Sequence, residues 1–332
     1  MTTPDGAAAE AAPASSSLLA RLRRSRPDNL IVYVGFVAIL LFFSITLADR
    51  GFLTPENFAN IARQTAMVSI MAFGMTFVLA GGEIDLSIGS VVALSSLVVA
   101  VLLRAALPIP VAVGGALLAG LLVGLANGLL VTRLRIPSFL VTLGTMTIVV
   151  GLARDLTDLE PVPIVNETFA FWFGSGSLGP VPILLVWTGL ALVVFHVLLR
   201  RTPFGRQVLA TGGNRAAARF SGIRTDRTKV AVLMLGAGTA ALAGMLYAGR
   251  LQGARYTLGE NDLMTVIAAT VIGGTSLFGG RGSIVGALVG SLLVGMLNNG
   301  LLLMNLSVSD QLIARGVIII LAVALSLRER RG

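Results

Sequence analysis

Ten apolar runs, each 17 to 25 residues long, dominate this sequence of 332 residues. An α-helix of about 20 apolar residues is long enough to cross the hydrocarbon core of a bilayer. Only 12% of the residues are charged and 55% are hydrophobic, whereas about 25% of the residues in an ordinary soluble domain are charged. We therefore predict an all-α polytopic membrane protein with about ten transmembrane helices. The runs are 30–48, 64–80, 86–103, 107–131, 137–153, 181–199, 230–249, 263–280, 283–303 and 311–327.

The scarcity of some residue types excludes several kinds of chemistry. The chain has no cysteine and a single histidine, His196, so we expect no disulfide, thiolate nucleophile, metal site or Ser–His catalytic pair. A phosphate-binding loop needs a Lys followed by Ser or Thr, but the single lysine, Lys229, is followed by Val230. The sequence therefore predicts a chain that is not an enzyme, binds no cofactor and does not hydrolyse ATP through such a loop.

The distribution of basic residues predicts the orientation in the membrane. With the N-terminus in the cytoplasm, 18 of the 25 Lys and Arg residues fall on the cytoplasmic side, as the positive-inside rule requires. Both termini are then cytoplasmic. The net charge of +9 therefore reflects these basic cytoplasmic segments. We expect the lipid bilayer as a partner and no nucleic acid. We divide the chain into a disordered basic N-terminal tail (1–29), a transmembrane domain (30–327) and a cytoplasmic C-terminal tail (328–332).

Two glycine-containing breaks separate neighbouring apolar runs. One is Gly81–Asp85 and the other is Gly279–Gly282. Each is either a short cytoplasmic turn or a helix break inside the membrane, where protein or a water-filled cavity would surround it. Glu83 and Asp85 lie in the first break and are candidate polar elements of a translocation path, because ionisable groups within a membrane are often functional. Alternatively, Asp85 caps the following helix.

The longest basic segment, residues 200–229, holds eight of the Lys and Arg residues. Asn214 is a good N-cap, three alanines follow it, and Gly222 can end a helix in the left-handed conformation. We predict a short basic helix here, between two spans. The composition alone favours the interpretation of this segment as a solvated loop that fixes topology by its charge.

Two further patterns concern packing. The loop at 154–180 is acidic and contains four aromatic residues close together, which is typical of a segment at the membrane interface, although contact with an outside partner is the alternative. Gly286 and Gly290 form a small-residue face that predicts close helix packing, with ligand binding as the alternative.

Four stretches together resemble a known family. They are Phe52–Phe58 continuing through Gly74–Val78 to Gly81–Ser90; Asn127–Gly128 with Ile136–Gly144; Gly212–Asn214; and Ile267–Leu277 with Gly280–Ser283 and Leu297–Gly300. In order and spacing they are similar to the permease subunits of bacterial ABC importers for ribose, xylose and related monosaccharides. The resemblance extends over most of residues 50–327.

This resemblance implies partners and a location. The chain would lie in the bacterial plasma (inner) membrane and form the pathway with a second permease copy or a paralogue. A cytoplasmic ATPase subunit would dock inside, and an extracytoplasmic sugar-binding protein would deliver the substrate. Which sugar, or other small polar solute, is transported does not follow from the sequence.

The resemblance also implies site residues. Permeases of this class carry a Glu-Ala-Ala-x-x-x-Gly motif that couples them to the ATPase, and here its first position is Ala216. We expect substitution of Arg219 and Gly222 to reduce coupling without blocking membrane insertion. The implied coupling residues are Asn214, Ala216, Ala217, Ala218, Arg219, Ser221 and Gly222. The candidate translocation path comprises Glu83, Asp85, Asn127, Thr142, Thr275, Asn298 and Asn299.

Two other classes of protein are weighed against this interpretation. A secondary transporter of a small polar solute, driven by protons or sodium, would place acidic or histidine residues near the membrane midplane, and this chain has few. An intramembrane enzyme would need a catalytic set that is not evident.

Overall fold

The computed structural model describes residues 30–307, 309–314, 316, 317 and 320. The two predicted tails and most of the last apolar run lie outside these residues. Each of the other nine apolar runs contains a helix. Six helices are long and apolar enough to cross a membrane: α3 (Pro55–Ala80), α5 (Ile109–Arg133), α6 (Ser138–Asp155), α8 (Ile183–Arg201), α11 (Thr225–Leu251) and α13 (Ile284–Leu303). Three apolar helices are shorter: α2 (Leu30–Thr46), α4 (Ile88–Arg104) and α12 (Asp262–Ile272).

These helices confirm the predicted fold class, an all-α polytopic membrane protein. The expectation of ten spans remains a prediction, because six of the described helices are long enough to span by themselves. Run 263–280 is not one continuous helix: α12 ends at Ile272, where Gly273 and Gly274 follow, and Gly274 has a positive φ of 91°. Consecutive glycines favour such a break because they lack the Cβ that restricts the backbone.

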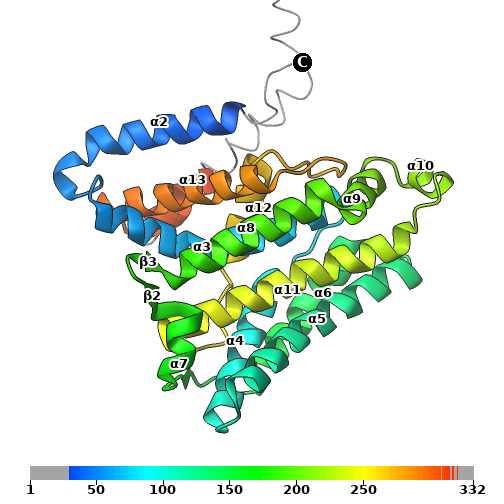
Figure 1. Cartoon of the computed structure of the whole chain (residues 1–332), viewed down its shortest axis with the longest axis horizontal. Coiled ribbons are helices and arrows are strands. Elements are labelled where there is room, and N and C mark those ends of the chain that lie inside the picture. Colours follow the sequence, from blue (N-terminus) through cyan, green and yellow to red (C-terminus); the bar gives the residue numbers. More distant parts are fainter. Residues whose placement is uncertain (1–29, 308, 315, 318–319, 321–332) are drawn as a thin grey trace, which may run out of the picture.

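The long helices run alongside one another (Figure 1), and α3 and α13 are buried to the greatest extent. α3 is the most buried of the six long helices, while α5 and α6 are the least buried and expose leucines such as Leu118 and Leu122. Two helices that follow α8, namely α9 (Pro203–Gly213) and α10 (Arg215–Phe220), lie at one end of the bundle. We call this the α10 end. The short helix α7 (Glu167–Ala170) lies at the opposite end, which we call the α7 end.

Glycines allow close approach at two helix pairs. Gly120, Gly124 and Gly128 occupy one face of α5, and a Cβ on Gly128 would lie 2.7 Å from the Cα of Val230 in α11. This seam follows the small-xxx-small pattern of membrane helices and was not singled out in the sequence. The predicted face at Gly286 and Gly290 does pack against a helix, because a Cβ on either would overlap backbone atoms at the end of α12.

The segment between α6 and α8 contains only short elements. Phe169 is fully buried and stacks on Phe173 at 4.8 Å, whereas Phe171 and Trp172 are exposed. The aromatic cluster therefore divides between the protein interior and its surface. The elements here are β1 (Val162–Pro163), α7, the π-helix η2 (Phe171–Ser175), β2 (Ser177–Leu178) and β3 (Val181–Pro182). β1 pairs antiparallel with β4 (Gly253–Ala254), β2 pairs antiparallel with β3, and the 3-10 helix η1 (Ala48–Arg50) follows α2.

Candidate functional site

The basic segment between α8 and α11 folds into two helices joined at Asn214. The predicted short helix is α10, and the Asn214 Oδ1 accepts a hydrogen bond from the Ala217 N–H at 3.0 Å, which confirms the predicted N-cap. Gly222 follows the helix with a positive φ of 83°, as expected for a left-handed C-terminal residue. The helix α9 was missed. Its signals were Thr202, which caps it through a 3.2 Å bond from Gly205 N–H, and Pro203 in its first turn.

Charged side chains join α10 to the first turn of α11. Arg215 donates to Asp226 Oδ1 at 2.8 Å, and Arg219 donates to both oxygens of Asp226 at 3.0 Å. The Nε of Arg219 also donates to the hydroxyl of Thr225 at 3.0 Å. Four side chains thus hold the short helix against the start of a long one, and they join α10 to α11.

The residues of α10 differ in what they present to the surface. Ala218 is buried, whereas Ala216 and Ala217 are exposed. Phe220 is 95% exposed, more than any other large apolar side chain among the described residues. Phe278, 81% exposed, lies in the segment between α12 and α13. Isolated aromatic side chains with such exposure suit a protein interface. The sequence reading had not selected Phe220 as a site residue, although an aromatic residue ending a basic helix was a visible signal.

Three glycine pairs meet at the α10 end. The Gly280 N–H donates to the Ala80 carbonyl at 2.9 Å. A Cβ on Gly212 would overlap that same carbonyl oxygen, and a Cβ on Gly280 would lie 2.8 Å from the Cα of Gly213. The end of α9 is therefore wedged against both glycine-containing breaks, at residues 81–82 and 279–280. Backbone contacts thus join α9 to both breaks.

The first break, residues 81–87, is mostly buried, although Gly82 is exposed. Glu83 is 3% exposed and forms an ion pair with Lys229 of α11. Further along, a Cβ on Gly236 of α11 would lie 3.8 Å from Asp85 Oδ2. Gly236 is 11 residues beyond Thr225, or roughly 16 Å along the helix. Because the surrounding residues bury it, the segment fits the alternative of an interrupted helix within the bundle better than that of an exposed turn.

Asp85 belongs to a buried polar network. Its Oδ1 accepts from the N–H and the hydroxyl of Ser87, at 2.8 and 2.6 Å, and Ser87 Oγ accepts from Asn127 Nδ2 at 3.0 Å. Asp85 therefore bonds to Ser87 and not to helical N–H groups of α4, which lacks a side-chain cap bond. Asp85 Oδ2 and Asn127 Oδ1 have no hydrogen-bond partner among the described residues. Two oxygen acceptors are thus left open at a buried position.

The other candidate path residues fall into three places. Thr142 of α6 joins the first group, since its hydroxyl accepts from the Leu86 N–H at 3.1 Å and donates to the carbonyl of Ile84 at 3.2 Å. Thr275 is buried in the segment between α12 and α13. Asn298 and Asn299 lie near the far end of α13, where Asn299 exchanges two hydrogen bonds with Asn57 at 2.8 and 3.0 Å. That end is roughly 22 Å from Ile284.

The seven candidate residues therefore do not make up one cluster. Glu83, Asp85, Asn127 and Thr142 converge around the break at 81–87, while the asparagines of α13 stand apart. In the part of the chain that the structure describes, no group of three or more His, Cys, Asp or Glu residues could hold a metal ion. The arrangement offers hydrogen bonding and conformational coupling, without a set of groups for bond-breaking chemistry.

Comparison with known proteins places the chain in a family. Residues 57–323 match the model of the family described as the branched-chain amino acid transport system / permease component. The chain belongs to this family of transport permeases, and within it to the ABC sugar permeases. It is 41% identical to the ribose import permease of Bacillus subtilis over 87% of this chain and 90% of the relative.

Two further relatives agree with this placement. The chain is 38% identical to the ribose import permease of Haemophilus influenzae, over 89% of this chain and 92% of the relative. It is also 38% identical to the L-arabinose ABC transporter permease of Azospirillum brasilense, over 87% and 85% of the two chains. No solved structure matches the chain. The family resemblance seen in the sequence is therefore confirmed.

Proposed function

We propose that this chain is the membrane-spanning subunit of an ATP-driven importer that translocates a monosaccharide, either a pentose or a hexose. The relatives named as ribose and L-arabinose permeases support the substrate class. The observation that carries the mechanism is the α10 helix, which is clamped to α11 through Asp226 and presents an almost fully exposed Phe220. A rigid helix with an aromatic anchor suits seating in a cleft of a partner protein.

The partner at this end would be a cytoplasmic ATPase subunit. The ABC permease relatives support two further partners of the chain: a sugar-binding protein on the outer side that delivers substrate, and a second permease copy or a paralogue that completes the pathway. The orientation places the α10 end and both chain termini in the cytoplasm of a bacterial inner membrane. The basic residues of 200–229 support this orientation.

Coupling would use two connections that leave α9 and α10. Closure of the ATPase subunits on ATP moves α10, and the Asp226 clamp carries this motion into α11. The glycine contacts of α9 carry the same motion to the breaks at 81–87 and 279–282. Since the first break ends in the Asp85, Ser87 and Asn127 network, the motion rearranges polar groups inside the bundle. Such a two-state element, biased by nucleotide, accounts for alternating access.

The buried network also favours a second candidate function, that of an ion-coupled secondary transporter of a small polar solute. Asp85 is a fully buried acid with one oxygen unpartnered among the described residues, and buried acids carry ions or protons in such transporters. The two candidates differ in their energy source. An importer subunit needs the ATPase chain, whereas a secondary transporter needs an ion gradient.

Reconstitution in liposomes tests the proposal. The chain is incorporated with and without its ATPase and binding-protein partners, and uptake of radiolabelled ribose and arabinose is followed with ionophores present. We expect uptake that requires internal ATP and the ATPase chain and persists when ion gradients are collapsed. Uptake by the chain alone that ionophores abolish would instead establish the secondary transporter.

A further inference from the structure

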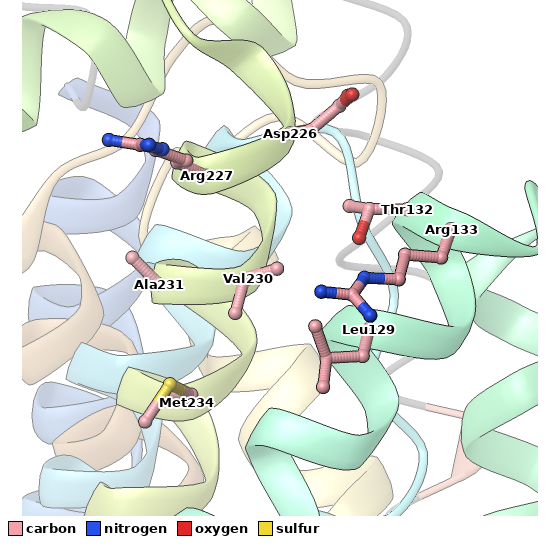
Figure 2. A pocket seen from close by; sticks show the side chains of 8 residues that line it. All are labelled: Leu129, Thr132, Arg133, Asp226, Arg227, Val230, Ala231 and Met234. Atoms are coloured by element: carbon pink, nitrogen blue, oxygen red, sulfur yellow. The ribbon is translucent and has the colours of Figure 1, made fainter.

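A pocket of about 410 Å³ opens between α5 and α11 at the α10 end. The two helices are in close contact at Gly124 and Gly128, but beyond Gly128 the last turn of α5 diverges from the first turn of α11 (Figure 2). Its volume lies within the range of about 300–1,000 Å³ that is typical of small-molecule sites. The residues that line it are Leu129, Thr132, Arg133, Asp226, Arg227, Val230, Ala231 and Met234.

The lining divides into an apolar part and a charged part. Leu129, Val230, Ala231 and Met234 lie on the side toward the middle of the helices, and the charged residues lie toward the helix ends (Figure 2). The guanidinium group of Arg133 is turned into the space between α5 and α11, beside Leu129. A ligand that fills this pocket must therefore have an apolar portion and a polar end.

The charged part of the lining is positive. Within the described part of the chain, neither Arg133 nor Arg227 has a hydrogen bond or an ion pair. The carboxylate of Asp226 is engaged by Arg215 and Arg219 of α10, so it does not neutralise the two pocket arginines. Two free guanidinium groups at the rim call for an anion, and guanidinium groups bind phosphate with parallel hydrogen bonds.

The surroundings of the pocket are apolar and exposed. Leu118, Leu122 and Leu130 of α5 are between 39% and 55% exposed, in a helix long and apolar enough to span a membrane. In a membrane, that surface is in contact with lipid or with another apolar helix. The pocket thus combines an acyl-chain surface with a cationic rim, at the level where a spanning helix leaves the hydrocarbon core.

The side chain of Arg227 is directed away from Arg133 (Figure 2), so only Arg133 is placed to bind a group inside the gap, and Arg227 adds positive charge at the rim. We propose that this pocket binds an anionic phospholipid, with the headgroup phosphate at Arg133 and the start of one acyl chain against Leu129, Ala231 and Met234. Basic pockets between transmembrane helices hold anionic headgroups in this way. A free phosphate ion would leave the apolar part of the lining unused. The binding rests on the membrane location of the chain, whereas the effect on coupling that follows rests on the proposed function.

The position of the pocket has a consequence for regulation. Asp226 lines the pocket and also holds α10 in place. A lipid seated between α5 and α11 fills the gap beside this first turn of α11, and so stiffens the connection between α10 and the bundle. Anionic lipid is thereby expected to favour coupled transport over uncoupled ATP hydrolysis.

Native mass spectrometry of the full-length chain in detergent tests lipid binding directly. The chain is titrated with phosphatidylglycerol and, separately, with phosphatidylcholine of the same acyl chains. We expect tighter binding of phosphatidylglycerol, weakened about fivefold by Arg133→Gln, since one arginine near an anionic lipid surface contributes about that factor. Arg227→Gln should weaken it less, because its side chain is directed away from Arg133. Arg201→Gln, at an exposed arginine in the last turn of α8 and outside the pocket, leaves the affinity unchanged.

A second pair of variants tests the apolar part without altering charge. Ala231→Trp fills the pocket and should abolish the preference for phosphatidylglycerol, whereas Leu130→Trp, on the exposed side of α5, should not. Equal affinity for both lipids, or equal loss in Arg201→Gln, would overturn the proposal. Displacement of the lipid by millimolar inorganic phosphate would also overturn it, because the site would then be one for a free anion.

Discussion

The two ends of the bundle are constructed differently. Close glycine contacts occur at both ends, since a Cβ on Gly174 at the α7 end would overlap the backbone of Gly249 and Arg250. At the α7 end these contacts are combined with aromatic side chains: Phe169 stacks on Phe173, and the indole N–H of Trp187 donates to the Trp172 carbonyl at 2.8 Å. At the α10 end the glycine contacts are combined with the charged clamp at Asp226. The α7 end is acidic in residues 155–167, and the α10 end carries eight Lys and Arg residues within 200–229.

This difference indicates what each end does. Stacked aromatic rings and an amide pair between Asn57 and Asn299 hold the α7 end in one arrangement. At the α10 end, three segments that are distant in sequence meet at glycine residues, whose lack of a side chain lets their backbones touch. The side chains of Phe220 and Phe278 are exposed there. We interpret the α10 end as the part that receives and transmits motion. The following changes test the contrast, from the largest expected effect to the smallest.

Lys229→Met is expected to have the largest effect on stability. It leaves the Glu83 charge buried without its ion-pair partner, and breaking a buried pair in this way costs about 3–5 kcal/mol of unfolding free energy. Chemical denaturation in detergent measures the loss. The double variant Glu83→Gln with Lys229→Met removes both charges and should recover most of it. Equal destabilisation of the single and double variants would show that the ion pair is not responsible.

Gly212→Ala is expected to disrupt the glycine junction. The added Cβ would overlap the Ala80 carbonyl oxygen, and overpacking of this kind costs about 1–3 kcal/mol. The midpoint temperature of thermal unfolding should fall, and ATP-driven uptake should be lost. Gly151→Ala in α6 is the matched control, because no atom lies within 4 Å of its added Cβ and alanine favours a helix over glycine. If Gly212→Ala changed neither the unfolding temperature nor ATP-driven uptake, the transmission of motion through this junction would be contradicted.

Phe220→Ala should weaken docking of the ATPase chain without changing stability. The side chain is 95% exposed, so its removal does not affect packing, but an interface anchor contributes about 2 kcal/mol. The affinity for the ATPase subunit should fall about 30-fold, measured by surface plasmon resonance on nanodiscs. Phe171→Ala removes an exposed aromatic residue at the α7 end and should leave that affinity unaltered.

Arg219→Gln has the smallest expected effect on stability. Its pair with Asp226 is about half exposed on both sides, and such pairs contribute at most about 1 kcal/mol. The number of sugar molecules transported per ATP should nevertheless fall, because only Arg215 then holds α10 to Asp226. Asn299→Ala, at the α7 end, should lower stability by about 1 kcal/mol without changing that ratio. A fall in both variants would remove the distinction between the two ends.

Much of the fold was predictable from local sequence. Long apolar runs specify helices by composition, and Asn214 with Gly222 specified the bounds of α10 through capping chemistry. The family was likewise predictable from the residues of four stretches. The capping signals of α9, Thr202 and Pro203, were equally local and could have been used.

The long-range arrangement could not be predicted in the same way. The contacts of Gly212 with Ala80 and of Gly280 with Gly213 join segments that are far apart in sequence, and no local pattern specifies such pairs. The Glu83–Lys229 pair and the separation of Asn299 from Asp85 are also tertiary results. The four-residue period of Gly120, Gly124 and Gly128 is visible in the sequence, but the sequence does not show that α11 is the helix that packs against them.

Cross-linking tests most directly the claim that the α10 end receives the ATPase. The chain has no cysteine, so Phe220→Cys and Phe171→Cys each introduce a single thiol. Each variant is purified with its ATPase subunit and treated with a short thiol-to-amine cross-linker. We predict that the thiol at position 220 forms a covalent product with the ATPase and the thiol at position 171 does not. A product from position 171 alone would place the ATPase at the opposite end and contradict the account.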